Sequence, residues 1–124
     1  MIAADASSFR RYSAGEHGAD VDAVESALRS ESLYFPPVAI TELLSDPRAD
    51  DRIIALIAKI PLLEIRNGFW QRAGALRATL LRTGVKAAIA DTLIAQSCID
   101  HNVPLITHDR DFRHFAKAGL KLLA

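Results

Sequence analysis

The sequence predicts an α/β fold in which helices cover both faces of a central, mainly parallel sheet. Short apolar runs that suit buried strands alternate with longer segments whose apolar residues recur at helical spacing. Half of the 124 residues are hydrophobic, which is enough for a real core and argues against a disordered chain. The length, and the lack of a repeat or a linker-like tract, predict one domain over residues 1–124.

The first part of the chain predicts two strands and two helices. Residues 2–5 (IAAD) form a short apolar run that suits a buried strand, and residues 21–28 carry valine, alanine and leucine at helical spacing. Residues 33–37 (LYFPP) favour a strand that the two prolines end. The second proline suits the first turn of a helix over residues 37–45, which a following Asp-Pro pair ends.

The middle of the chain predicts a short strand between two helices. Residues 53–60 (IIALIAKI) read as a helix that Pro61 closes, and residues 62–65 (LLEI) as the strand. A longer helix is expected over residues 69–82, where a Thr-Gly pair ends it. Trp70 on this helix is expected in the core or at an interface with another chain.

The last part predicts a helix, a strand and an edge strand. The helix is expected over residues 86–101, the strand over residues 103–107 and the edge strand over residues 121–123. Cys98 lies within the apolar pattern of the helix and is expected to be a small core residue rather than a nucleophile.

Two acidic residues stand where predicted strands end. Asp5 follows the first apolar run. Asp109 follows the apolar run over residues 103–107, and Asp111 stands two residues further on. Because ligands collect beyond the carboxyl ends of parallel strands, Asp5 and Asp109 are expected to be neighbours in space.

Two further carboxylates lie on apolar helix faces. Asp91 has alanine, isoleucine and cysteine as its neighbours at helical spacing, and Glu42 is the single charge in PPVAITELLS. A buried carboxylate without a partner is costly and tends to protonate. A bound cation is one way to compensate both.

Each of these acids has a simpler explanation when it is taken alone. Asp5 could cap a turn, Glu42 could be half exposed, Asp91 could satisfy a loop, and Asp109 and Asp111 could form Asx turns. Taken together they predict a metal site. A set of oxygen ligands selects Mg²⁺ or Mn²⁺, whose usual work is to bind phosphate oxygens and activate water, so hydrolysis of a phosphodiester or phosphomonoester is expected.

The histidines offer a rival site. His101, His108 and His114 are close in sequence, and three histidines can bind zinc. Their spacing of seven and six residues does not place two of them on one helix face, so the carboxylate site is preferred.

Charge and cysteine content limit the surroundings of the protein. Lysine and arginine total 15 and aspartate and glutamate total 15, so bulk charge makes no case for nucleic-acid binding, although a local basic patch remains open. The single cysteine cannot form an internal disulfide, which fits a reducing compartment such as the cytoplasm. The N-terminus does not read as a signal peptide and no apolar run is long enough for a bilayer, so no membrane association is expected.

Three motifs together resemble a known family. In order they are IAADASSF, AITELLSDP and AIADTLIAQSCIDHNVPLITHDRDF. They resemble the successive motifs of PIN domains and, more closely, those of the small bacterial VapC-type toxins of type II toxin–antitoxin pairs. The resemblance covers the whole chain, and the last motif is its most specific part.

The resemblance implies a fold, an activity and a set of site residues. It implies a PIN-type α/β/α sandwich with a parallel sheet and RNA hydrolysis that depends on Mg²⁺ or Mn²⁺. The acidic positions of the family fall on Asp5, Glu42, Asp91 and Asp109, with Asp111 as an assisting acid.

Supporting positions and departures follow from the same motifs. The supporting hydroxyls of the family fall on Ser7 and Thr107. Ala6 stands where the family commonly has threonine, and His108 where it often has arginine; neither change removes a metal ligand.

The resemblance also implies partners. VapC-like toxins are held by a cognate antitoxin and often form homodimers. Arg10 and Arg11, which closely follow Asp5, are candidates to hold the RNA phosphates, although they could equally be solvated helix charges.

Two other functions compete with RNA hydrolysis as explanations of the acidic residues. A haloacid-dehalogenase-like phosphatase also has an aspartate after its first strand, but it needs a second aspartate where this chain has Ser7. A catalytically inactive PIN scaffold that binds a partner would have no need of inward-facing acids.

Overall fold

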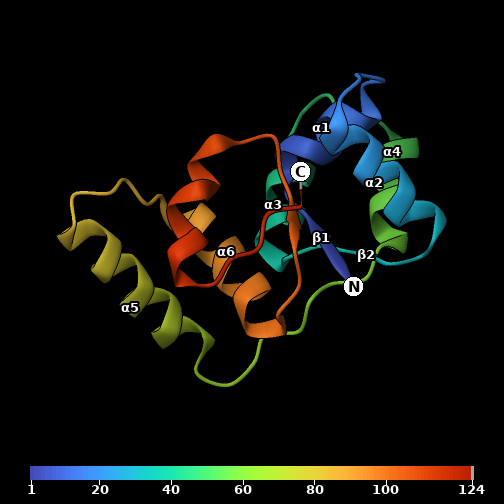
Figure 1. Cartoon of the computed structure of the whole chain (residues 1–124). Helices are drawn as coiled ribbons and strands as arrows, with labels where there is room; N and C mark the ends of the chain where they lie inside the picture. Colours follow the sequence, from blue (N-terminus) through green and yellow to red (C-terminus); the bar gives the residue numbers. More distant parts are fainter. Residues whose placement is uncertain (124) are drawn as a thin grey trace.

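A central parallel sheet of three strands organises the protein, for which a computed structural model describes residues 1–123 (Figure 1). The strand order is β2-β1-β3, with β1 (Ile2–Ala4) between β2 (Leu33–Tyr34) and β3 (Leu105–Ile106). Ile2 pairs with Leu33 on one side of β1, and Ala3 pairs with Leu105 on the other. The first strand is therefore the centre of the sheet, which brings the two ends of the chain together.

Two expected strands are reduced to single bridges. Phe35 bridges to Leu62 and Leu105 bridges to Leu122, both in parallel orientation, at the two edges of the sheet. The strands expected over residues 62–65 and 121–123 are therefore wrong in extent, although each segment lies where an edge strand would. Edge segments find a partner on one side only, and apolar pattern does not reveal how far that pairing extends.

The helices α1 (Ala6–Ser13), α2 (Ala19–Arg29) and α4 (Asp51–Lys59) lie on one side of the strands in Figure 1. Helix α3 (Pro37–Leu44) packs against both α1 and α6. The sequence predicted α2, α3 and α4 but not α1, whose eight residues place only one fully buried large side chain, Phe9, in the core.

The helices α5 (Phe69–Arg82) and α6 (Ile89–His101) and the 3-10 helix η1 (Arg110–Ala118) lie on the other side (Figure 1). Together with the first group they make the predicted α/β/α sandwich. Helix α6 begins three residues later than expected, because Ala88 before it is still extended. The sequence missed η1, whose period of three residues matches neither an α-helix nor a strand.

The core is rich in phenylalanine: Phe9, Phe35, Phe69, Phe112 and Phe115 are each at most 1% exposed. Cys98 is also buried, as expected, and burial raises the pKa of its thiol to about 12. Trp70 is 61% exposed and so does not belong to the core; its neighbour Phe69 is buried instead. Within residues 1–123, no helix has the length and apolar character needed to span a membrane.

Candidate metal centre

Asp5 links the carboxyl ends of β1 and β3. It follows β1 and is the N-cap of α1, where its carboxylate accepts a hydrogen bond from the backbone N–H of Ser8 at 3.0 Å. The hydroxyls of Ser7 at 2.8 Å, Ser8 at 3.0 Å and Thr107 at 2.5 Å also donate to it. Asp5 is 3% exposed, and burial raises the pKa of its carboxyl although these donors oppose the shift. Both carboxylate oxygens of Asp5 are therefore already occupied by donors.

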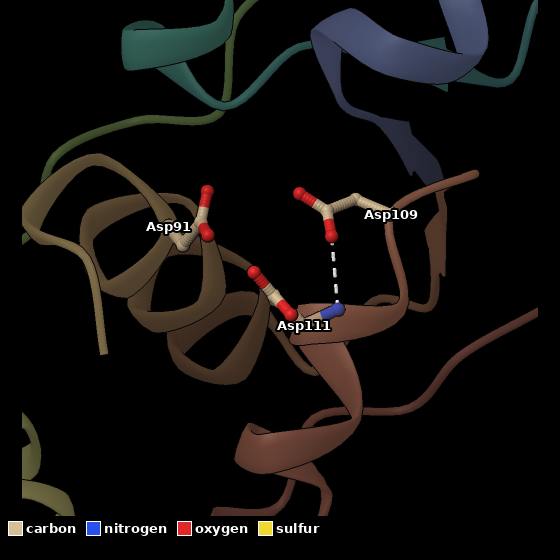
Figure 2. A group of neighbouring side chains, drawn as sticks. All are labelled: Asp91, Asp109 and Asp111. Carbon is tan, nitrogen blue, oxygen red and sulfur yellow. Dashed lines mark hydrogen bonds between the residues drawn. The ribbon is translucent and has the colours of Figure 1, made fainter. Parts of the chain in front are cut away.

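The chain after β3 turns sharply into η1 through a series of hydrogen bonds. Thr107 Oγ1 accepts from the backbone N–H of Asp109 at 3.0 Å, and Asp109 Oδ1 accepts from that of Asp111 at 2.9 Å (Figure 2). Asp109 is thus the N-cap of η1. Ser7 Oγ accepts from the backbone N–H of His108 at 3.0 Å, which fixes the turn against α1. This turn holds Asp109 and Asp111 at the carboxyl edge of the sheet.

Asp91 faces this turn from the opposite side. It lies in the first turn of α6, and its side chain points toward Asp109 and Asp111 (Figure 2). One oxygen from each of the three carboxylates lies within 4.8 Å of the others. The pKa of Asp91 is raised to about 6, first by burial and then by the negative charges of Asp109, Glu42, Asp111 and Asp5.

Glu42 completes a small cavity next to this group. The cavity has a volume of about 110 Å³ and is lined by Asp5, Glu42, Asp91, Asp109 and one cation, Arg10, among others. Burial, together with the charges of Asp5 and Asp109, raises the pKa of Glu42, and the guanidinium of Arg10 opposes this shift. The structure therefore brings the four main predicted acids to one place, with Asp111 at its rim.

The donor set of the cavity fits a hard divalent cation. Carboxylate oxygens are the ligands that Mg²⁺ and Mn²⁺ prefer, and several acids so close together destabilise one another without a cation. Asp91, Asp109 and Asp111 present oxygens close enough to share one ion, whereas the oxygens of Asp5 are held by four neighbouring donors. The role of each acid as a metal ligand stays a prediction.

The three clustered histidines do not form a site in the described part of the chain. His101 Nε2 lies 2.7 Å from the backbone oxygen of Glu64, and His114 Nδ1 lies 3.0 Å from that of Lys86. Among residues 1–123, the group of side chains that could share a metal ion consists of aspartates alone. The geometry therefore favours the carboxylate site over the rival zinc site.

The two arginines predicted to hold RNA are both engaged by neighbours. Arg10 donates from Nη2 to the backbone oxygen of Glu42 at 2.9 Å, and its Nε lies 3.4 Å from Asp46. Arg11 donates from Nε to Asp20 at 2.9 Å and from Nη1 to Glu16 at 2.8 Å. Their contact with RNA stays a prediction, and Arg10 alone of the two lines the carboxylate cavity.

Ser8 is a supporting residue that the sequence did not single out. It is fully buried, and its hydroxyl contacts both Asp5 and the backbone oxygen of Ile106 at 3.0 Å. The spacing from Asp5 to Ser8 is that of an N-cap and the third residue of a helix, so recognising α1 would have revealed it.

Parallel strands that end at a cavity of carboxylates are typical of folds that can hold a divalent cation. Residues 3–118 match the PIN domain, so the chain belongs to the PIN domain family. PIN domains are generally metal-dependent nucleases, which agrees with the acidic cavity. A search of curated proteins found no match to the chain.

Proposed function

We propose that this protein is an endoribonuclease dependent on Mg²⁺ or Mn²⁺ and acts as the VapC-type toxin of a toxin–antitoxin pair. The observation that carries the enzymatic part is the approach of Asp91, Asp109 and Asp111 to within 4.8 Å at the strand ends of a PIN domain. The match to the PIN family favours a nuclease over the haloacid-dehalogenase-like phosphatase. Moreover, the hydroxyl of Ser7 donates to Asp5, at the place where that phosphatase needs an acid.

Asp91, Asp109 and Asp111 would hold the cation, with Asp5 and Glu42 facing it from the other wall of the cavity. A divalent cation bound there supplies a water of lowered pKa and positive charge for the phosphate in the transition state. The four carboxylates of the cavity give the protein the means to bind such an ion, whereas Arg10 is the one cation of the cavity that could attract a phosphate directly. An inactive scaffold would gain nothing from this costly group of acids.

The neighbouring residues of the chain position these groups. Thr107 Oγ1 accepts a hydrogen bond from the backbone N–H of Asp109 and so fixes its position. Asp5 in turn accepts hydrogen bonds from the hydroxyls of Thr107 and Ser7. Glu42 lines the cavity and would accept a hydrogen bond from the attacking water. Arg10 brings a guanidinium to the same cavity, where it would offset the charge of the bound phosphate.

The toxin role rests on the resemblance of the motifs. A cognate antitoxin and a second copy of the chain would both need apolar surface. Ile54 on α4 is 42% exposed, and Trp70 and Leu81 on α5 are 61% and 48% exposed. These two helices are therefore the candidate docking surfaces, and a small DNA-binding protein encoded immediately upstream would support the toxin role.

The enzymatic proposal is tested by Asp91→Asn, with Asp22→Asn as the matched control. Both aspartates lie in the first turn of a helix, but Asp22 is exposed on α2 away from the cavity. We expect Asp91→Asn to lower the rate of Mn²⁺-dependent cleavage of single-stranded RNA by about 100-fold or more, because a metal-ion contribution is worth several kcal/mol. The control should cut at the wild-type rate. If folded Asp91→Asn cuts as fast as the control, the assigned site is wrong.

A further inference from the structure

A second hollow opens on the far side of Asp109. It has a volume of about 470 Å³ and is lined by Arg11, Asp20, His108, Asp109, Arg110 and Arg113, with several small or apolar neighbours. Asp109 lines both this hollow and the carboxylate cavity. A molecule bound across Asp109 would therefore contact the two sites together.

The period of η1 places its arginines along one edge. In a 3-10 helix, side chains three residues apart lie above one another. Phe112 and Phe115 share the buried edge, and Asp111 shares another with His114, which contacts the backbone oxygen of Lys86 ahead of α6. Arg110 and Arg113 share the remaining edge, and both line the second hollow. The same short helix thus presents an acid to the cavity and two arginines to the adjoining hollow.

The two arginines of this edge have no charged partner in the described part of the chain. Both are exposed, and within residues 1–123 neither forms an ion pair or a side-chain hydrogen bond. Arg11 in the same hollow is different, because Asp20 and Glu16 already hold its guanidinium.

A hollow on the opposite side of the cavity, which shares Arg10 with it, provides a contrast. Its volume is about 290 Å³, and its two nearby arginines are both paired with Asp46: Arg10 at 3.4 Å and Arg48 at 3.1 Å. An arginine whose charge is paired with a carboxylate adds less to the local positive potential that attracts a polyanion. Of the two hollows that share a residue with the carboxylate cavity, the one beside Asp109 therefore has arginines in its lining without an ion-pair partner among residues 1–123.

We infer that the hollow beside Asp109 binds the backbone of single-stranded RNA next to the cleaved bond, and that Arg110 and Arg113 contact successive phosphates. The inference rests on the proposed ribonuclease function and says from which side the substrate enters. One turn of a 3-10 helix separates the two arginines by about 6 Å along the axis, which suits neighbouring phosphates of one strand. A guanidinium is also the side chain whose donors match phosphate best. An RNA strand with one phosphate in the carboxylate cavity would pass Asp109 and continue directly into this hollow.

The test measures the salt dependence of RNA binding in a variant that does not cleave. A fluorescent single-stranded RNA is titrated with Asp91→Asn, and with Asp91→Asn that also carries Arg110→Gln and Arg113→Gln. The control combines Asp91→Asn with Arg82→Gln and Lys117→Gln, which remove two exposed charges outside the hollow. Fluorescence anisotropy is read from about 50 to 200 mM salt. The slope of log K against log salt is negative, and each lost phosphate contact to a single strand makes it shallower by about 0.7.

We expect the Arg110→Gln and Arg113→Gln pair to make that slope shallower by about 1.4 and to weaken binding at least tenfold at low salt. The control pair should keep the slope of its parent. Equal slopes for the two pairs would overturn the inference. Failure of the proposed function looks different, because the wild-type protein would then cut no RNA in Mn²⁺ whatever the salt slopes.

Discussion

At the scale of single residues, the site is a compromise between stability and metal binding. Asp91 is partly buried beside four other acids, and the pKa of its carboxyl is raised from 3.8 to about 6. A raised pKa means that the folded protein favours the protonated form, so the charged form present at neutral pH destabilises the fold. A divalent cation bound in the cavity would offset this unfavourable charge.

Asp91→Asn is therefore expected to stabilise the metal-free protein, and the gain should depend on pH. The favourable contribution of protonated Asp91 is present below about pH 4 and is lost as the pH rises through 6. At pH 7.5 the variant should exceed the wild type by about 1 kcal/mol in free energy of unfolding, a value discounted for partial exposure. The difference should vanish near pH 4.

Urea unfolding in EDTA at the two pH values measures this difference. A variant that is less stable than the wild type at neutral pH would show that Asp91 makes a favourable contact that the structure does not reveal. Added Mn²⁺ should reverse the order, because it stabilises only the protein that keeps the full set of ligands.

At the scale of elements, two short helices position the site, and both were missed by the sequence. The eight residues of α1 contain three serines and two arginines, and its start depends on the side chain of Asp5 rather than on intrinsic helix preference. The start of η1 depends in the same way on Asp109. Such caps are hydrogen bonds from polar side chains, so an apolar pattern read along the chain does not show them.

The element-scale prediction compares two N-caps. Asp5 caps α1 and Asp50 caps α4, and each accepts one backbone N–H, from Ser8 and Ile53 respectively. Asp50→Ala should lower the free energy of unfolding by about 1 kcal/mol. Asp5→Ala should lower it by about 2 kcal/mol or more, because it also removes the acceptor of three hydroxyl groups, two of which belong to buried residues.

Chemical denaturation of both variants in EDTA measures the difference. Equal losses would mean that the hydroxyl contacts of Asp5 add nothing to stability. In that case the position of Asp5 at the junction of β1 and β3 would serve the metal rather than the fold.

At the scale of the whole molecule, strand order explains why distant residues meet. Because β1 lies between β2 and β3 in a parallel sheet, Asp5 and Asp109 emerge at the same edge although 104 positions separate them. Helices α3 and α6, which contact each other, add Glu42 and Asp91 from the side. The site is thus assembled from both ends and the middle of the chain.

Much of this arrangement could be predicted from the sequence. The alternation of apolar runs and helical segments predicted the α/β sandwich, and acids at strand ends or on apolar helix faces predicted the cavity. Which acids present oxygens close enough to share one ion, and which is instead held by hydrogen-bond donors as Asp5 is, could not be predicted. That difference depends on the donors that surround Asp5. The basic edge of η1 could not be predicted for a related reason. Arg110 and Arg113 share a face only if the helix has three residues per turn.

The central claim is that a divalent cation in the carboxylate cavity supports RNA cleavage. Its most direct test is to strip the protein with EDTA and to follow cleavage of a labelled single-stranded RNA before and after Mn²⁺ is restored. We predict no product in EDTA and recovery of cleavage on addition of Mn²⁺, because the acids alone repel the phosphate that they must bind. Cleavage that persists unchanged in EDTA would contradict the claim.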